Sequence, residues 1–266
     1  LSIDGSKEIH DKYRKNIGGA GSFDIIMENL KRFDPEFIKK NVTFSATIHD
    51  REDLLKSYEF FSQMFPHNVL RFGFTKSDDL IDGKKRGLAK RIYLKILSET
   101  YFEKMKNGGP DRFLRFLFDQ PMERIFFRAR KYNGEEIIPV GFCIPGARKL
   151  FVSSKGKFYS CEKLGYDQFE IGDVEIGINY KKVIDILEEI KRLSSEKCSN
   201  CWATPLCNSC IMLDSCKEGI INEERLNESC IRKRQSILDY LGIYTEHFNE
   251  KEFVNHLKKL KGGITR

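Results

Sequence analysis

Eight cysteines are the residues of this sequence with the clearest chemical potential. All of them lie between Cys143 and Cys230, and the 142 residues before Cys143 contain none. Four form two closely spaced pairs, with the spacing Cys198-x2-Cys201-x5-Cys207-x2-Cys210. A C-x2-C pair lets two sulfur atoms converge on one centre while the intervening amides point at them. The pattern favours a metal site in a reducing compartment over a disulfide scaffold.

A predicted hairpin separates two further cysteines. Residues 149–153 and 157–160 are rich in β-forming side chains and flank Ser154-Lys155-Gly156. Gly156 suits a tight turn that a Cβ atom would disfavour. The hairpin would return the chain and bring Cys143 and Cys161 to one side of the sheet.

The spacing alone leaves the metal open. Paired C-x2-C motifs fit tetrahedral zinc with four thiolate ligands. Eight thiolates also suffice for two iron–sulfur clusters of four ligands each, and a disulfide framework is the third alternative.

The cysteine-free part alternates strands and helices. The expected elements are a strand end at 1–4, a helix at 23–30, a strand at 41–48, a helix from about 50 to 65, a strand at 69–74 and a helix at 84–106. This order implies a parallel sheet with helical crossovers. Ser22 and Asp50 are the expected helix N-caps, and Pro35 is expected to interrupt the helical pattern.

The rest of the chain predicts helices around a cysteine loop. One or two helices at 111–132 are rich in Phe and Arg and are interpreted as core packing. An amphipathic helix at 180–193 precedes a cysteine loop at 198–217. A helix entered between Ser215 and Glu223 follows, and then a basic helix near 249–261 that we expect to be a solvated end.

Composition excludes several classes of protein. The 266 residues are 40% hydrophobic and 32% charged, with a net charge of +7, which does not demand a nucleic-acid partner. No apolar run approaches the roughly 18 residues of a membrane span, and no secretory signal opens the chain. We therefore expect a cytoplasmic protein without nucleic-acid or membrane partners.

The order of the cysteines resembles a known family. Cys143-x12-Gly156-x4-Cys161, the two C-x2-C pairs and Cys230 resemble the SPASM extension of radical S-adenosylmethionine (SAM) enzymes. The opening Leu1-Ser2-Ile3-Asp4-Gly5, with His10-Asp11-x-x-Arg14 after it, resembles the fourth strand and turn of the radical SAM barrel. The resemblance covers essentially the whole chain.

That resemblance implies an α/β fold and three regions. Residues 1–140 would form the second half of a partial (β/α)6 barrel with connecting helices, residues 141–240 the SPASM domain with its β-hairpin and helices, and residues 241–266 a C-terminal helix. The catalytic C-x3-C-x2-C loop of the family has no match in the sequence. We expect it upstream of Leu1, so that this chain alone has no radical activity.

The resemblance also implies two auxiliary 4Fe-4S clusters. Cys143, Cys161 and Cys210 would bind the first. Cys198, Cys201, Cys207 and Cys230 would bind the second. Cys216 is an extra cysteine that either completes the first site or is a structural thiol. The family usually places three residues, and not two, between the cysteines that match Cys207 and Cys210.

Four other residues acquire expected roles from the resemblance. Ser2 would lie near bound SAM, and Asp4 and Arg14 are cofactor-binding candidates, with a turn-stabilising pair as the alternative. Glu162 follows Cys161 directly, where the sulfatase-maturating branch has an Asp base. It is a candidate base, and the alternative is a solvent-facing Glu paired with Lys163.

The implied activity is oxidative modification of a peptide. The full-length enzyme would use SAM and a third 4Fe-4S cluster, act on a ribosomally made precursor peptide and receive electrons from a flavodoxin or ferredoxin. The segment from Cys143-Ile144-Pro145-Gly146 to Lys163 favours a maturase that forms thioether or other crosslinks. The alternatives are an anaerobic sulfatase-maturating enzyme that forms formylglycine and a non-catalytic zinc-binding interaction module.

Overall fold

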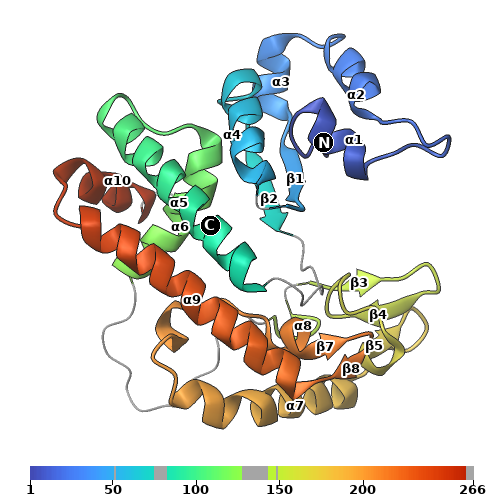
Figure 1. The fold of residues 1–266 in the computed structure, drawn as a ribbon. Coiled ribbons are helices and arrows are strands. Elements are labelled where there is room, and N and C mark those ends of the chain that lie inside the picture. The colour runs from blue at the N-terminus through green and yellow to red at the C-terminus, as the bar shows by residue number, and fades with distance from the viewer. Residues whose placement is uncertain (51, 75–82, 128–142, 148, 262–266) are drawn as a thin grey trace. The chain divides into compact units, whose positions relative to one another are not determined.

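The computed structural model describes residues 1–50, 52–74, 83–127, 143–147 and 149–261. The chain divides into two compact units, one of Leu1–Phe126 with Gly242–Arg266 and the other of Phe127–Leu241 (Figure 1). The expected boundary near residue 140 and the end of the helical segment 111–132 lie outside the described residues.

The first unit is built on parallel strands, as the alternating pattern predicts. β1 (Phe44–Ile48) pairs in parallel with β2 (Leu70–Phe74), and α4 (Asp53–Met64) connects them (Figure 1). The opening residues add to the other edge of β1, since the Ile3 amide donates to the Ser45 carbonyl at 3.0 Å. Phe44, Ala46 and Ile48 are all buried, which is the spacing of one strand face.

Seven helices of the described chain lie wholly in this unit. They are α1 (Lys7–Tyr13), α2 (Phe23–Leu30), α3 (Pro35–Asn41), α4, α5 (Gly83–Lys106), α6 (Arg112–Phe126) and α10 (Lys251–Lys261). The Phe-rich face of α6 is core, as predicted, with Phe113 and Phe118 almost fully buried.

Three expectations for this unit are wrong. Pro35 starts α3 instead of ending a pattern, because Pro suits the first helical position and the Asp34 carboxylate accepts from the amides of the first turn. Asp50 is not the cap of α4. Glu52 directly precedes the helix, and the Asp50 carboxylate accepts from Lys12 and Tyr13 at the end of α1. The basic helix α10 is not a solvated end, since it packs against α5 and α6 and buries Phe253 and Leu257 completely.

The second unit holds the cysteines. Its four-stranded antiparallel sheet has the order β3 (Phe151–Val152), β4 (Lys157–Tyr159), β5 (Glu170–Asp173) and β6 (Gly177–Ile178). The predicted hairpin is β3–β4, and Gly156 in its turn has φ +74°. The other elements are two short 3-10 helices, α7 (Tyr180–Ser199), α8 (Ile211–Ser215), the hairpin β7 (Cys216–Lys217) with β8 (Ile220–Ile221), and α9 (Glu223–His247), which continues into the first unit.

The core of the second unit brings together residues from the whole cysteine region. It consists of Leu164, Phe169, Ile190, Leu193, Ile211, Met212, Cys216 and Leu226. Four other cysteines pack against it: Cys161, Cys198, Cys210 and Cys230. The apolar core therefore draws the sulfur-bearing segments to one place.

Candidate metal centres and the strand-end network

One set of thiols comes from α7, the loop after it and α9. The predicted cysteine loop begins too early, because α7 continues through Ser199 and carries Cys198 in its last turn. Tight backbone bonds fold the following loop: Cys201 N donates to the Cys198 carbonyl at 3.2 Å, and Cys207 N to the Thr204 carbonyl at 3.2 Å. The Thr204 hydroxyl also donates to the Cys198 carbonyl at 2.6 Å.

The charges of these thiols interact. Burial, together with the neighbouring Cys230, Cys207 and Cys201, raises the pKa of Cys198 to about 11. Burial likewise raises the pKa of Cys230, with Cys207 and Cys201 acting in the same direction. Thiols that raise one another's pKa lie close enough for their negative charges to repel. Cys198, Cys201, Cys207 and Cys230 are therefore coupled electrostatically, and we call them the second set.

The other set is smaller and lies at the hairpin. Burial raises the pKa of Cys210, and Asp214, Cys161 and Cys143 add to the effect. Cys210 immediately precedes α8, and Cys161 follows β4. Cys143, Cys161 and Cys210, the first set, are therefore near enough to interact electrostatically.

Cys216 differs from the others in its surroundings. It is 7% exposed and is itself a member of the apolar core, whereas Cys143 is exposed and the remaining six are partly exposed. All eight cysteines are free thiols, so the disulfide framework is not what the structure has.

The donor chemistry fits an iron–sulfur cofactor. Four-iron clusters are held by Cys thiolates, and amides that donate to those sulfurs stabilise their negative charge. The Ser209 amide already donates to the Cys207 sulfur at 3.5 Å. Within the described ranges, no three His, Cys, Asp or Glu side chains form a group that could hold a single metal ion.

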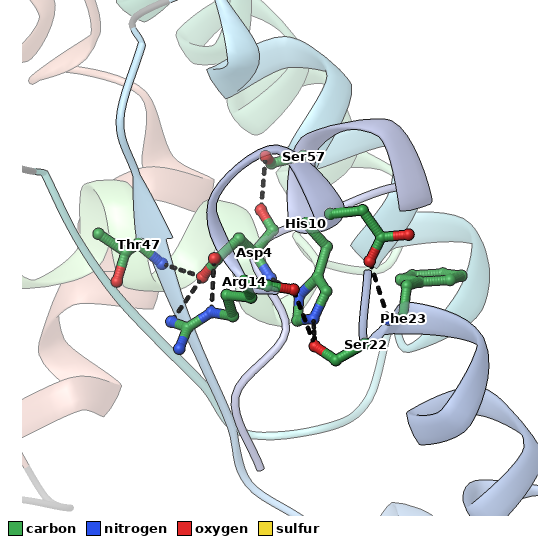
Figure 2. Close-up of polar contacts among 8 residues, drawn as sticks. Asp4, His10, Arg14, Ser22, Phe23, Thr47 and Ser57 are labelled. Atoms are coloured by element: carbon green, nitrogen blue, oxygen red, sulfur yellow. Dashed lines mark hydrogen bonds and ion pairs between the residues drawn. The ribbon is translucent and has the colours of Figure 1, made fainter. Parts of the chain in front are cut away.

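A second polar centre lies at the end of the opening strand. Asp4 is completely buried, and its carboxylate accepts from Arg14 Nε at 2.6 Å and Arg14 Nη2 at 2.9 Å (Figure 2). The Thr47 amide on β1 donates to the same carboxylate at 2.7 Å. The Ser57 hydroxyl on α4 donates to the Asp4 carbonyl at 3.0 Å. Asp4 thus ties the opening strand to β1, α4 and the residue that follows α1.

His10 extends this strand-end network. It is fully buried, and its Nδ1 accepts from the Asp4 amide at 3.3 Å, which leaves the proton on Nε2, 3.0 Å from the Ser22 hydroxyl (Figure 2). Burial lowers the pKa of His10. The Ser22 hydroxyl donates to the Arg14 carbonyl and does not cap α2, and the Asp11 carboxylate accepts from Phe23 N in its place.

The other two predicted site residues are exposed. Ser2 pairs with Ser45 in a parallel bridge, and its side chain is open to solvent. Glu162 is exposed next to Cys161, and in the described part of the chain it forms no ion pair with Lys163. Sequence reasoning missed Thr47, Ser57 and Ser209, because no local pattern marks a polar group that becomes buried through distant segments.

Comparison with solved structures defines the class of fold. The chain superposes on native anSMEcpe with bound AdoMet with a TM-score of 0.62, 20% identity and coverage of 98% of this chain and 68% of that chain. Native anSMEcpe with bound AdoMet and the Cp18Cys peptide gives a TM-score of 0.63 at 20% identity, covering 97% and 69%. The chain therefore has the α/β fold of these structures over that length.

Sequence comparison identifies the relatives. The chain is homologous to anaerobic sulfatase-maturating enzymes: it is 25% identical over 215 residues to the cysteine-type enzyme of Clostridium novyi and 24% identical over 218 residues to that of Clostridium perfringens. The matches cover 79% and 78% of this chain, which spans about half the length of these relatives, 56% of each. No protein-family model matches the sequence.

These comparisons confirm the resemblance stated on the cysteines and the opening strand. They also change the order of the functional alternatives, because the relatives lie in the sulfatase-maturating branch and not in the crosslinking branch that the sequence favoured. No described helix has the length and apolar character needed to cross a lipid bilayer.

Proposed function

We propose that this chain is the part of a radical SAM maturase that holds its auxiliary iron–sulfur clusters and contributes the second half of its partial (β/α)6 barrel. The observation that carries the proposal is the electrostatic coupling of free thiols in two sets, each with two members that pack against one apolar core. Cys198, Cys201, Cys207 and Cys230 would hold one cluster. Cys143, Cys161 and Cys210 would hold the other.

Bound iron–sulfur clusters supply one-electron redox chemistry. The chain's own residues prepare the sites for them. Packing against an apolar core limits the contact of Cys161, Cys198, Cys210 and Cys230 with water, and the Ser209 amide donates to the Cys207 sulfur. The Thr204 hydroxyl donates to the Cys198 carbonyl and so orders the turn after Cys198, which would limit the movement of that ligand.

In unit 1, the strand-end network supports the proposed cofactor side of the half-barrel. Ser2, which is open to solvent, would face SAM. The contacts of Asp4 and Arg14 favour a positioning role, because the carboxylate oxygens of Asp4 are all taken by Arg14 and Thr47. These two residues hold the strand end that carries Ser2.

We propose a polypeptide substrate whose Cys side chain is oxidised. Conversion of Cys to formylglycine is the first candidate reaction, since the relatives are cysteine-type sulfatase-maturating enzymes. Glu162 would act as the base, because an exposed carboxylate beside Cys161 can reach a substrate thiol. Crosslink formation is the second candidate, favoured by the Cys143-Ile144-Pro145-Gly146 segment and by Glu162 in place of the Asp of the sulfatase branch.

The test uses the gene product that contains this chain, purified without oxygen. It is given SAM, a flavodoxin or ferredoxin reducing system, and a sulfatase-derived peptide with one Cys. We expect an aldehyde in the peptide, detected with a hydrazide probe and by mass spectrometry, and none in the Cys→Ala peptide. A peptide that has lost two hydrogens and its free thiol but contains no aldehyde supports the crosslinking candidate. An unchanged peptide with intact SAM contradicts both candidate reactions.

A matched pair of variants tests the base. Glu162→Gln should abolish the product while SAM is still cleaved, because only proton removal from the substrate is lost. Glu175→Gln, which changes another exposed Glu of the same unit, should leave the product yield unchanged. Equal yields from the two variants contradict the role of Glu162.

A further inference from the structure

Ser209 lies in the short link between the two sets of thiols. Only Asn208 and Ser209 separate Cys207 of the second set from Cys210 of the first set. Three peptide links span at most about 11 Å between Cα atoms. Any group on this link is therefore close to both candidate metal centres.

The two linking side chains have opposite surroundings. Asn208 is exposed, and its Oδ1 accepts from Lys233 on α9 at 2.6 Å. Ser209 is 8% exposed, and its amide donates to the Cys207 sulfur at 3.5 Å. The side-chain amide of Asn208 is therefore held at the surface by Lys233, whereas Ser209 is buried and its backbone amide faces the Cys207 sulfur.

The Ser209 hydroxyl is buried and has no hydrogen-bond partner in the described part of the chain. A buried hydroxyl in this condition costs folding free energy, so such groups are rare and point to a missing partner. Two other buried serines of the unit are satisfied: Ser194 donates to the Ile190 carbonyl at 2.7 Å and Ser215 to the Met212 carbonyl at 3.2 Å. Burial alone does not leave a serine of this unit without a partner.

We propose that the Ser209 hydroxyl donates a hydrogen bond to a sulfur atom of an iron–sulfur cluster bound beside it, and so raises the reduction potential of that cluster. This inference rests on the proposed function. Cluster sulfur is the acceptor that the chain lacks at this position, and it becomes more negative on reduction. A donor aimed at it therefore stabilises the reduced state more than the oxidised state.

The test is a redox titration of the 266-residue chain, loaded with iron and sulfide without oxygen and followed by electron paramagnetic resonance. Ser209→Ala should lower the ratio of reduced to oxidised cluster at a fixed potential about tenfold, a shift of about 59 mV for one electron. Ser209→Thr keeps the hydroxyl and should restore the wild-type potential. Ser194→Ala is the matched control, because it removes a buried hydroxyl whose partner is a backbone carbonyl.

The outcomes separate the two proposals. A wild-type chain that takes up no iron contradicts the proposed function itself. If all variants contain the same amount of iron and only Ser209→Ala has a changed reduction potential, the inference is supported. The cluster whose potential changes is then the hydrogen-bond acceptor. Equal iron with equal potentials overturns it and leaves a trapped water as the partner.

If Ser209→Ala loses its iron, a second variant that lacks the hydroxyl is needed for the titration. Ser209→Gly removes the same hydroxyl and keeps the backbone amide that faces Cys207. A lowered potential in Ser209→Gly supports the inference. If both variants keep their far-UV circular dichroism but lose iron, Ser209 is needed for binding the cluster and the tuning role is contradicted.

Discussion

Removing the charge of Asp4 should destabilise the first unit by much more than removing a surface carboxylate. The substitution Asp4→Asn keeps the shape of the side chain. Its oxygen can still accept from the Thr47 amide and from Arg14 Nη2, but its NH2 group then faces the Nε–H donor of Arg14. Two donors that face each other cannot form a hydrogen bond.

The burial of the pair sets the size of the effect. Breaking a buried ion pair by removing one partner costs roughly 3–5 kcal/mol. The Asp4 side chain is 0% exposed but that of Arg14 is 35% exposed, so water can partly solvate the guanidinium that remains. Hydrogen bonds to charged groups contribute about 1.5–3 kcal/mol. We therefore expect a loss of about 2–3 kcal/mol.

Hydrogen exchange is the suitable assay, because a chain of two units need not unfold in one step. The opening free energies of amides on β1 and α1 should fall by the stated amount, with Thr47 among them. Asp24→Asn is the control: Asp24 pairs with Lys7 at the surface, with side chains 62% and 57% exposed. Such a pair contributes at most about 1 kcal/mol. Equal exchange in the two variants would refute the structural role of the Asp4–Arg14 pair.

Three further predictions concern single positions. Gly172→Ala should disrupt β5–β6, because φ is +138° and a Cβ would lie 2.0 Å from the Gly177 carbonyl oxygen, whereas Gly165→Ala should keep the wild-type thermal unfolding midpoint. The first unit should lose stability as pH falls below about 6.5. Burial lowers the pKa of His10, so the unfolded chain binds the proton more readily than the folded chain. His10→Gln should flatten this pH dependence of the opening free energies measured by hydrogen exchange, and an unchanged slope would contradict the role of His10. Thr204→Val should reduce protection of residues 198–207 by about 1–3 kcal/mol, because the Cys198 carbonyl loses its 2.6 Å partner, and full protection would contradict this.

Local patterns were sufficient for the elements that carry their own signal. The alternation in Phe44–Ile48 and the Gly-containing turn at Gly156 predicted a parallel strand and a hairpin, and both are present. The exposed lysines of α10 suggested a solvated helix, but Phe253 and Leu257 are four residues apart and share a face that packs against distant helices. The burial of α10 depends on tertiary packing, which a local sequence window does not contain.

The same division holds for the candidate sites. The cysteines were predictable by type and spacing, because thiolate ligands have few alternatives. The strand-end network was only partly predictable. Ser22 lies directly before α2 as expected, but its hydroxyl contacts Arg14 and His10 and does not cap the helix. Ser209 could not be found from sequence, since a serine shows its burial and its missing partner only after the chain has folded around it.

The central claim is that two separate sets of thiols each hold a four-iron cluster. Iron and sulfide content of the anaerobically loaded chain tests it most directly, with about eight irons expected per chain from two clusters of four. Cys201→Ser should remove about half of the iron, Cys161→Ser the other half, and Cys216→Ser, a change within the apolar core, should leave the content unchanged. A colourless chain that binds two zinc ions, or a chain in which either single variant loses all its iron while remaining folded, would contradict the account.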